Sequence, residues 1–462
     1  TFCGYLKKTT FARPKNLSDN PGASLLARGF RTVSKRGRLN MLNRKDSPAV
    51  FEIRELPLPQ PQLRLLDNGM PVYVLPYPGR QVLKVEVSYQ AGRPEEGKPM
   101  SARATARLLS EGSRRRSSAD IAEWFDFYGS SFSNPTNLDT ANFILFTLEK
   151  YAEAVLPVFA ETLLEPAFPE SELQNFQETN IRELMVELDK VEVLAYRQIT
   201  EAMFGSAHPY GYNSTPEMYR ALTQADLPDF YQRWFTPANG LIFVSGEVTD
   251  HVLQLLNETL GQTPARGQKP AFSWNNPMPN PVRQHIPHPG ALQTGIKIGR
   301  RTFHKKHPDY NGMYVLNTIL GGYFGSRLML NIREKRGYTY NIYSSLDAML
   351  HDGYFYIATE VNSDKTKTTV KQIFQEMRRL QEQPVPTEEL NMVRNYLMGM
   401  LLNGLDGPLN SSDVVKSLIV DGLQAEHFQA LAHTILSITP EEIMQLAQRY
   451  FNPEDFWVVT VG

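Results

Sequence analysis

The histidines restrict the metal chemistry that this chain of 462 residues can perform. All nine lie at or beyond His208, so any histidine-dependent chemistry is built from the second half or supplied by another chain. The zinc-binding strings H-E-x-x-H and H-x-x-E-H are absent from the sequence. His304 and His307 have the spacing of a metal pair, but we expect them to be solvated in a basic loop. We expect the same of His285 and His288, which lie in a proline-rich stretch.

Three further patterns point to weaker candidates for chemistry. The glycine-rich stretch 320–326 lacks the G-K-[ST] ending of a phosphate-binding loop, so we expect a turn between two helices with Ser326 as the cap. The basic run Arg114-Arg115-Arg116 is expected to be a solvated helix end. Cys3 is the only cysteine, which excludes an intramolecular disulfide, a cysteine-based zinc finger and an iron–sulfur cluster.

The elements that would position functional side chains recur along the chain. The helix start P-x-x-E-L occurs at Pro169 and again at Pro386, an interval far too long for a solenoid repeat, which indicates a duplicated domain. Strands are predicted over 63–66, 71–75, 82–89, 140–147, 240–244, 294–298, 338–346 and 353–360, and helices over 102–109, 118–128, 152–164, 169–190, 310–320, 326–335 and 367–380. We expect an α+β fold of two homologous mixed domains, each with an antiparallel-rich sheet packed against helices. The domains are predicted over 41–262 and 291–462, joined by a proline-rich linker over 263–290.

Composition and charge limit the partners. The formal net charge is −1 and no apolar run is long enough to span a bilayer, so we expect neither a nucleic-acid nor a membrane partner. Residues 1–40 hold nine Lys and Arg against one acid, and lack the apolar core of a secretory signal. This expected disordered segment is either a basic, organelle-directing leader or an extension before a start at Met41. We favour the second, and with it the bacterial cytoplasm.

Several short sequence strings are informative because of the order in which they occur along the chain. Leu66-Asp-Asn-Gly69, Glu111-Gly-Ser113, His208-Pro-Tyr-Gly211, Tyr231 to Asn239, and Arg333-Glu-Lys-Arg-Gly-Tyr-Thr-Tyr340 follow one another along the chain. In this order they resemble the pitrilysin/insulinase family of zinc peptidases, in particular its short, two-domain bacterial branch. The resemblance covers residues 60–462.

The resemblance implies that the family's zinc site has been lost. The five positions of H-x-x-E-H fall on 103–107, where Arg103 and Arg107 replace the two ligands and Ala106 replaces the base. The third ligand position falls on Glu183. Because arginine offers no lone pair and alanine cannot move a proton, we expect no metal or cofactor in this chain, and zinc in a partner. One hypothesis is that both arginines pair with Glu183 or Glu187; the alternative is that they point to solvent.

A second pair of residues is retained. In the family, an Arg and a Tyr seven residues apart reach the zinc site from the second domain, and here they correspond to Arg333 and Tyr340. Both groups suit recognition of a scissile carbonyl. The alternative is that Arg333 caps its helix and Tyr340 packs in a strand.

The resemblance thus implies a zinc-less, non-catalytic subunit of a heterodimeric peptidase, inactive alone. Its partner would be a homologous chain bearing H-x-x-E-H, although a homodimer remains open, and its ligands would be extended or unfolded peptides held by edge-strand pairing. One alternative is a scaffold or peptide-binding protein with no hydrolytic role, like the family's core proteins of respiratory complexes. A metalloenzyme with relocated ligands is a further alternative, which the histidine-free first half disfavours.

Overall fold

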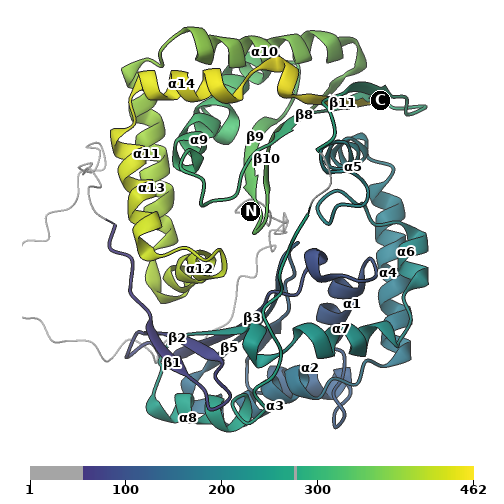
Figure 1. Cartoon of the computed structure of the whole chain (residues 1–462), viewed down its shortest axis with the longest axis vertical. Helices are drawn as coiled ribbons and strands as arrows, with labels where there is room; N and C mark the ends of the chain where they lie inside the picture. Colours follow the sequence, from purple (N-terminus) through teal and green to yellow (C-terminus); the bar gives the residue numbers. More distant parts are fainter. Residues whose placement is uncertain (1–55, 275–277) are drawn as a thin grey trace, which may run out of the picture. The chain divides into compact units, whose positions relative to one another are not determined.

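The fold is built from two β-sheets, each formed by one half of the sequence (Figure 1). The computed structural model describes residues 56–274 and 278–462, and these belong to one compact unit spanning Glu55–Gly462. The predicted leader over 1–40 and the start at Met41 lie outside the described residues. The predicted class, mixed α and β in two similar halves, is confirmed.

The first half contains a six-stranded sheet. Its elements are β1 (Gln62–Leu65), β2 (Pro71–Pro76), β3 (Val82–Tyr89), α1 (Ser101–Leu108), α2 (Ser118–Phe127), β4 (Ser131–Ser133), β5 (Ala141–Leu148), α3 (Ala152–Leu164), α4 (Glu170–Glu187), α5 (Val191–Phe204), α6 (Pro216–Ala221), α7 (Asp226–Trp234), β6 (Gly240–Gly246) and α8 (Asp250–Thr259). The strand order is β1-β2-β6-β3-β5-β4, with β2 and β6 parallel and the other pairs antiparallel. The predicted hairpin joins β1 to β2 through Gly69, whose φ of 81° suits glycine.

The second half contains a five-stranded sheet. Its elements are β7 (Arg283–Ile286), β8 (Gln293–Arg301), α9 (Tyr310–Asn317), η4 (Thr318–Gly322), η5 (Met329–Lys335), β9 (Ile342–Ala348), β10 (Gly353–Asn362), α10 (Thr366–Glu382), α11 (Thr387–Gly404), α12 (Gly407–Val420), α13 (Ala425–Ser437), α14 (Pro440–Tyr450) and β11 (Trp457–Val461). The strand order is β7-β11-β8-β10-β9, with β7 and β11 parallel. This order repeats β2-β6-β3-β5-β4 of the first sheet, as a duplication requires.

The repeat is also visible in the helices. α4 and α11 are each 18 residues long, and they begin at Glu170 and Thr387. Each follows a proline at its N-cap, so the P-x-x-E-L string starts a long helix in both halves, as predicted.

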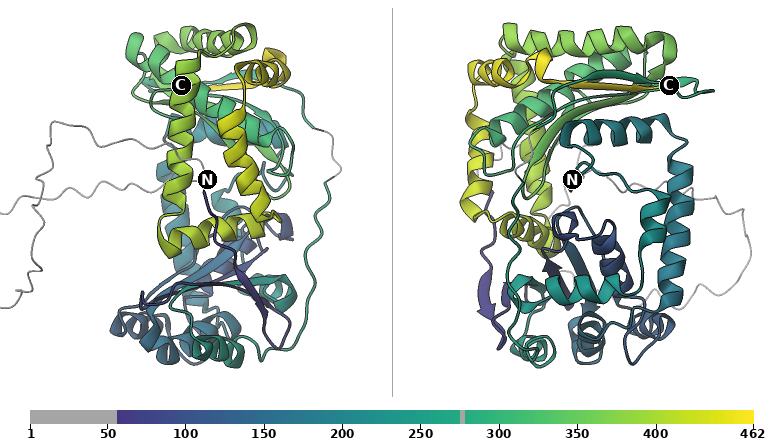
Figure 2. Two further views of the ribbon diagram at one scale, coloured as in Figure 1. Left: turned by 90° about the vertical axis from the view of Figure 1, so that its left-hand side faces the viewer. Right: turned by 45° about the vertical axis from the view of Figure 1, so that its right-hand side comes forward.

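The two halves exchange one helix each (Figure 2). α5 follows α4 but packs on β8 and β11 of the second sheet, whereas α12 follows α11 and packs on β6 and β2 of the first. Gly295 permits the first of these contacts, because a Cβ there would lie 2.6 Å from the carbonyl oxygen of Val191. Local patterns did not predict this exchange, which moves residues 191–204 from the first core to the second.

Two sequence predictions need correction. The linker over 263–290 contains a strand, β7, which is bounded by Pro281 and Pro287 and pairs with β11. The helix predicted over 310–320 changes at Thr318 from α to π geometry, and a turn before Arg327 then leads into the next helical segment. The predicted turn is therefore present, but Ser326 Oγ accepts no hydrogen bond among the described residues.

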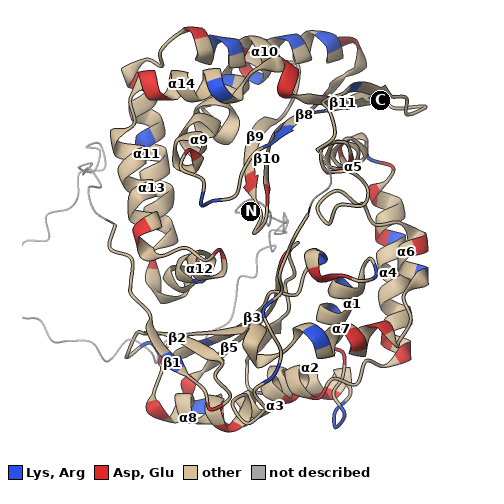
Figure 3. Ribbon diagram, viewed as in Figure 1, with Lys and Arg blue, Asp and Glu red and all other residues tan. Residues whose placement is uncertain are grey.

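The sign of the charge differs between helices. α4 is acidic, with Arg182 as its one cation, whereas α10 carries Lys and Arg interspersed with Glu (Figure 3). Within residues 56–274 and 278–462, no helix is both long and apolar enough to cross a membrane.

Candidate functional site

The positions of the expected zinc motif lie on α1. Its apolar face carries Ala102, Ala104 and Ala106, all buried, while Arg103 and Arg107 lie four residues apart on the exposed face. Ala106 is 0% exposed, so the position that carries the family's base is packed into the core of the first half. Helix α1 therefore keeps its structural role, although both ligand positions are occupied by cations.

Both arginines are held by neighbours from the first half. Arg103 Nη1 donates a hydrogen bond of 3.2 Å to the Tyr219 hydroxyl. Arg107 Nη1 donates to Asn134 Oδ1 at 3.0 Å, and its Nη2 lies 3.3 Å from a carboxylate oxygen of Glu111. The alternative that both side chains merely point to solvent therefore does not hold.

The hypothesis that these arginines pair with an acid of α4 also needs correction. Glu183 is exposed and forms no ion pair in the described part of the chain, while Glu187 pairs with Lys190 at 2.5 Å. α4 instead holds the partner of Arg103, because Gln177 Nε2 donates to the backbone oxygen of Tyr219 at 2.8 Å. The arginines instead contact Tyr219, Asn134 and Glu111.

Three of the four histidine candidates, His285, His304 and His307, have structural partners. His304 Nδ1 accepts the backbone N–H of Lys306, and His307 Nδ1 accepts that of Asp309, both at 3.1 Å. His285 Nδ1 lies 3.0 Å from the Thr460 hydroxyl, between β7 and β11. Within the described ranges, no group of three or more His, Cys, Asp or Glu side chains is arranged to hold a metal ion.

Sequence reasoning missed a group of buried carboxyls beside α1. Burial raises the pKa of Glu95 to about 8 and that of Glu96 to about 7, and it raises the pKa of Asp139 as well. Glu96 Oε1 accepts the backbone N–H of Ala102 at 3.0 Å, and Glu96 Oε2 accepts the Tyr212 hydroxyl at 2.5 Å. Perturbed carboxyls often mark functional sites, but each of these accepts hydrogen bonds within the protein, and Glu96 fixes the start of α1. The Gly92-Arg93-Pro-Glu-Glu string is the signal that could have located Glu95 and Glu96.

Asp139 joins the two halves. Its Oδ1 accepts the hydroxyl of Tyr210, and its Oδ2 accepts the backbone N–H of Leu350 at 3.1 Å. Tyr210 belongs to the core that α5 shares with the second sheet. The buried carboxyl therefore ties the segment before β5 to the loop after β9.

Arg333 and Tyr340 lie on either side of a tight turn in the second half. Arg333 is on η5, and the helical segment ends at Gly337, whose φ of 64° allows its N–H to bond Arg333 O at 3.0 Å. The N–H of Tyr338 bonds Ile332 O at 3.1 Å, which completes the capping motif. The chain then turns back into β9, with Tyr340 two residues before the strand begins.

The side chains of this pair are accessible. Tyr340 is 91% exposed, so the alternative that it packs in a strand is wrong. Arg333 is half-buried, with its guanidinium 4.6 Å from the centre of the Phe324 ring, itself 64% exposed. Neither the guanidinium nor the hydroxyl has a hydrogen-bond or carboxylate partner among the described residues. Their donors are therefore available to a ligand.

Comparison with known proteins identifies the family. Residues 102–209 match the family described as insulinase (peptidase family M16), and residues 221–397 match the peptidase M16 inactive domain. The chain belongs to the M16 family, the pitrilysin/insulinase group that the sequence strings indicated.

Three similar proteins give the context. An uncharacterized zinc protease of Mycobacterium leprae is 24% identical over 84% of this chain and 88% of its own length. A chain from Helicobacter pylori described as a non-peptidase homolog is 22% identical over 64% of this chain and 69% of its own. The crystal structure of a peptidase M16 inactive domain from Pseudomonas fluorescens has a TM-score of 0.78 at 22% identity, covering 87% of this chain and 98% of that one. The structural likeness confirms the expected fold.

Proposed function

We propose that this chain is the non-catalytic subunit of an M16 peptidase, and that it supplies Arg333 and Tyr340 to the zinc site of a partner chain. The observation that carries the proposal is a contrast between two sets of side chains. At the zinc-motif positions, Arg103 and Arg107 are tied to Tyr219, Asn134 and Glu111 of their own half. Arg333 and Tyr340 present donors that no described residue uses.

The chemistry of the retained pair supports a role at a peptide carbonyl. A planar guanidinium and a phenolic O–H can both donate to a carbonyl oxygen as negative charge develops on it. Contact with Phe324 restricts the Arg333 guanidinium, which lowers the entropy lost when a ligand binds. The chain's residues would then bind and orient a peptide, while the metal and its activated water come from the partner.

An open sheet edge supports the binding of extended peptides. Among the described residues β9 pairs only with β10, so its other backbone edge has no strand partner. A peptide added to this edge would be held by main-chain hydrogen bonds, which tolerate many sequences. Its backbone would pass Tyr340, which lies just before β9.

The test mixes the purified chain with an M16 chain that carries H-x-x-E-H, and follows cleavage of a quenched, unstructured peptide. We expect no hydrolysis by this chain alone, hydrolysis by the mixture, and zinc only in the partner by elemental analysis. Arg333→Gln and Tyr340→Phe should each lower kcat of the mixture about a hundredfold. Lys335→Gln and Tyr338→Phe, which change the same turn, serve as matched controls and should leave it unchanged.

Two results would overturn the proposal. Chelator-sensitive cleavage by the isolated chain, with zinc near one per chain, would show that the metal site is elsewhere in this protein. A stable complex that cleaves no peptide, or cleaves equally well with Arg333→Gln, would favour the scaffold alternative.

A further inference from the structure

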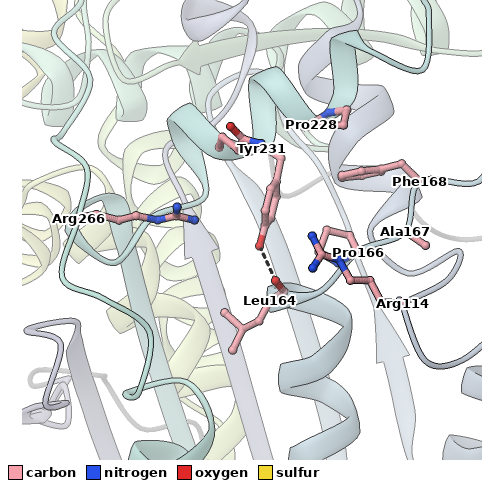
Figure 4. Close-up of a pocket in the computed structure, with 9 residues that line it drawn as sticks. Arg114, Leu164, Pro166, Ala167, Phe168, Pro228, Tyr231 and Arg266 are labelled. Atoms are coloured by element: carbon pink, nitrogen blue, oxygen red, sulfur yellow. Dashed lines mark hydrogen bonds between the residues drawn. The ribbon is translucent and has the colours of Figure 1, made fainter.

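A pocket in the first half lies away from α1 and the turn at Gly337, and the proposed function does not use it. Its volume is about 720 Å³, and it is formed where the loop after α1, the loop between α3 and α4, helix α7 and the segment after α8 meet. Its walls include the apolar and aromatic side chains of Leu164, Pro166, Phe168 and Tyr231, while polar atoms form the larger part of its surface. Figure 4 shows these side chains with Arg114 and Arg266 on either side of the Tyr231 ring.

Arg114 differs from the two arginines that follow it. Arg115 makes a two-pronged contact with Glu165, with nitrogen–oxygen distances of 3.1 and 2.8 Å, and Arg116 pairs with Glu161. Arg114 forms no ion pair within the described ranges, and its side chain lines the pocket. The basic run is therefore not uniformly a solvated helix end, since two members neutralise acids and the third carries an uncompensated charge.

Arg266 supplies a second such charge from a distant part of the chain. It lies in the segment after α8, and it likewise has no carboxylate partner in the part of the chain that the structure describes. In Figure 4 its guanidinium points toward Tyr231, opposite Arg114. No Asp or Glu lines the pocket. Two cations lining one cavity favour a ligand with negative charge.

The phenol between the two arginines stays neutral. Burial raises the pKa of Tyr231 to about 12, and its hydroxyl donates to the backbone oxygens of Leu163 at 2.8 Å and Leu164 at 3.2 Å. Tyr231 therefore does not neutralise the guanidinium groups at physiological pH. Its ring offers an apolar surface, which faces Phe168 with ring centres 5.9 Å apart.

We propose that this pocket binds a carboxylate attached to an apolar group, with Arg114 and Arg266 supplying the positive charge that attracts the carboxylate and Leu164, Phe168 and Tyr231 receiving the apolar part. Arginine suits a carboxylate because its paired N–H groups match the two oxygens. Two sources share this chemistry: a free aromatic or aliphatic acid, and the carboxy terminus of a peptide that ends in an apolar residue. The proposal does not depend on a zinc-bearing partner.

The test is calorimetric titration of the full chain with four probes. These are 4-phenylbutyrate, its neutral amide, a short unstructured peptide ending in Phe with a free carboxylate, and the same peptide amidated. We expect the charged member of at least one pair to bind and the neutral member to bind at least tenfold more weakly. Binding of phenylbutyrate alone identifies a free acid as the ligand, and binding of the peptide alone identifies a chain terminus.

Substitutions of the two pocket arginines test whether the probes bind in this pocket. Arg114→Gln and Arg266→Gln should each weaken binding about tenfold, because each removes a positive charge from the pocket. Arg182→Gln makes the same charge change on the exposed face of α4 and should leave the affinity unaltered. All three side chains are exposed, so thermal unfolding should be unchanged and will report any misfolding. Absence of binding by both charged probes at millimolar concentration, equal binding of charged and neutral probes, or affinities insensitive to Arg114 and Arg266 would each overturn the proposal.

Discussion

Glu86 and Lys297 occupy equivalent positions in the two sheets but carry opposite charges. Glu86 pairs with Phe243 of β6, and Lys297 pairs with Val459 of β11. These two partners are equivalent, because Phe243 follows the Phe-Thr-Pro string at 235–237 at the same distance at which Val459 follows Phe-Asn-Pro at 451–453. Glu86 is 0% exposed and Lys297 2% exposed.

Each of these charges is matched by the helix that comes from the other half. Glu86 meets Lys416 of α12 at 2.5 Å, and Lys297 meets Glu192 of α5 at 3.3 Å. Glu86 also lies 3.3 Å from the buried Lys84, which pairs with Asp413 of α12. The reversed charges mean that each exchanged helix fits the sheet that it covers, and a swap of the two would bring like charges together.

Removal of Glu86 and removal of Lys297 should change the free energy of unfolding by different amounts. Glu86→Leu leaves the buried Lys84 and the nearby Lys416 to share one acid, so we expect a loss of about 3 kcal/mol in the free energy of unfolding. Lys297→Met leaves only Glu192, which is 47% exposed and can be solvated, so the change should be within about 1 kcal/mol. Urea unfolding of both variants measures the difference, and equal losses would contradict it.

Gly295 should be essential for the position of α5. Gly295→Ala brings a methyl group against the Val191 carbonyl oxygen, 2.6 Å from the new Cβ, and should cost about 1–3 kcal/mol of stability. Gly399→Ala is the matched control, because a Cβ there, in the middle of α11, meets nothing within 4 Å. The control should gain up to about 1 kcal/mol from helix propensity. Thermal unfolding of the two variants should therefore shift in opposite directions; a stable Gly295→Ala would show that α5 can move away.

Two substitutions at the expected motif positions should create a zinc site. Arg103→His/Arg107→His places two imidazoles on the exposed face of α1, which packs against the helix that carries Glu183. We expect about one zinc per chain by elemental analysis after dialysis, and none in the unmodified chain. Adding Glu183→Ala should weaken zinc binding, and a histidine pair that binds no metal would mean that Glu183 is out of reach.

The base position is expected to behave differently from the ligand positions. Ala106 is 0% exposed, so Ala106→Glu puts a carboxylate against the core. The triple variant with both histidines should therefore unfold at a lower temperature than the double variant when zinc is removed. Equal unfolding temperatures would show that the new side chain can reach solvent.

His208 should make the protein sensitive to acid. Burial, followed by the nearby Arg301 charge, lowers its pKa to about 4 from an ordinary value of 6.5, so the folded protein keeps the ring neutral where the unfolded chain protonates it. Its contribution to stability is intact above pH 6.5 and is lost as the pH falls from 6.5 towards 4. Urea unfolding at pH 7, 6 and 5 should show a smaller decline in His208→Asn than in the unmodified chain. A parallel decline in both would exclude His208 as the cause.

Glu95 should have the opposite effect on the pH dependence of stability. Because burial raises its pKa to about 8 from an ordinary 4.5, the folded protein retains a proton that the unfolded chain releases. The stability from this group is complete below pH 4.5 and declines as the pH rises to 8. Glu95→Gln keeps an oxygen acceptor for the Gly92 N–H and removes the titration, so its stability should vary less between pH 5 and 8. If both proteins lose stability alike over that interval, another group is responsible.

Local patterns predicted most of the elements, because each depends on nearby residues. The Ser117 hydroxyl accepts a hydrogen bond from the backbone N–H of Asp120, and the Asp120 carboxylate accepts one from the backbone N–H of Ser117. Two side chains only three residues apart therefore set the start of α2. β7 was missed because its four residues alternate weakly between prolines and gain their place only from β11. The exchange of α5 and α12 has the same origin, since it depends on pairs such as Lys297 with Glu192 that are distant in the sequence.

The candidate site likewise combines features that the sequence predicted with features that depend on residues distant in the sequence. Residue types alone predicted that 103–107 lack metal ligands, because no geometry gives arginine a lone pair. The partners of Arg103 and Arg107 were not predictable, since Tyr219 and Asn134 come from loops and short helices distant in sequence. The group around Glu95 and Glu96 was missed for a related reason, because burial of a carboxyl follows from tertiary packing.

The helix exchange also imposes an order on biosynthesis. The strands that α12 covers are complete at Gly246, but α12 begins only at Gly407. At about 5–20 residues per second, a ribosome needs roughly 10–30 s to make the stretch between them. During this interval the face of the nascent first sheet that carries Lys84 and Glu86 is in contact with water. The charges of Lys84 and Glu86 lie beside Phe146 and Phe243 on this face, and they limit its adhesion to neighbouring chains during the wait.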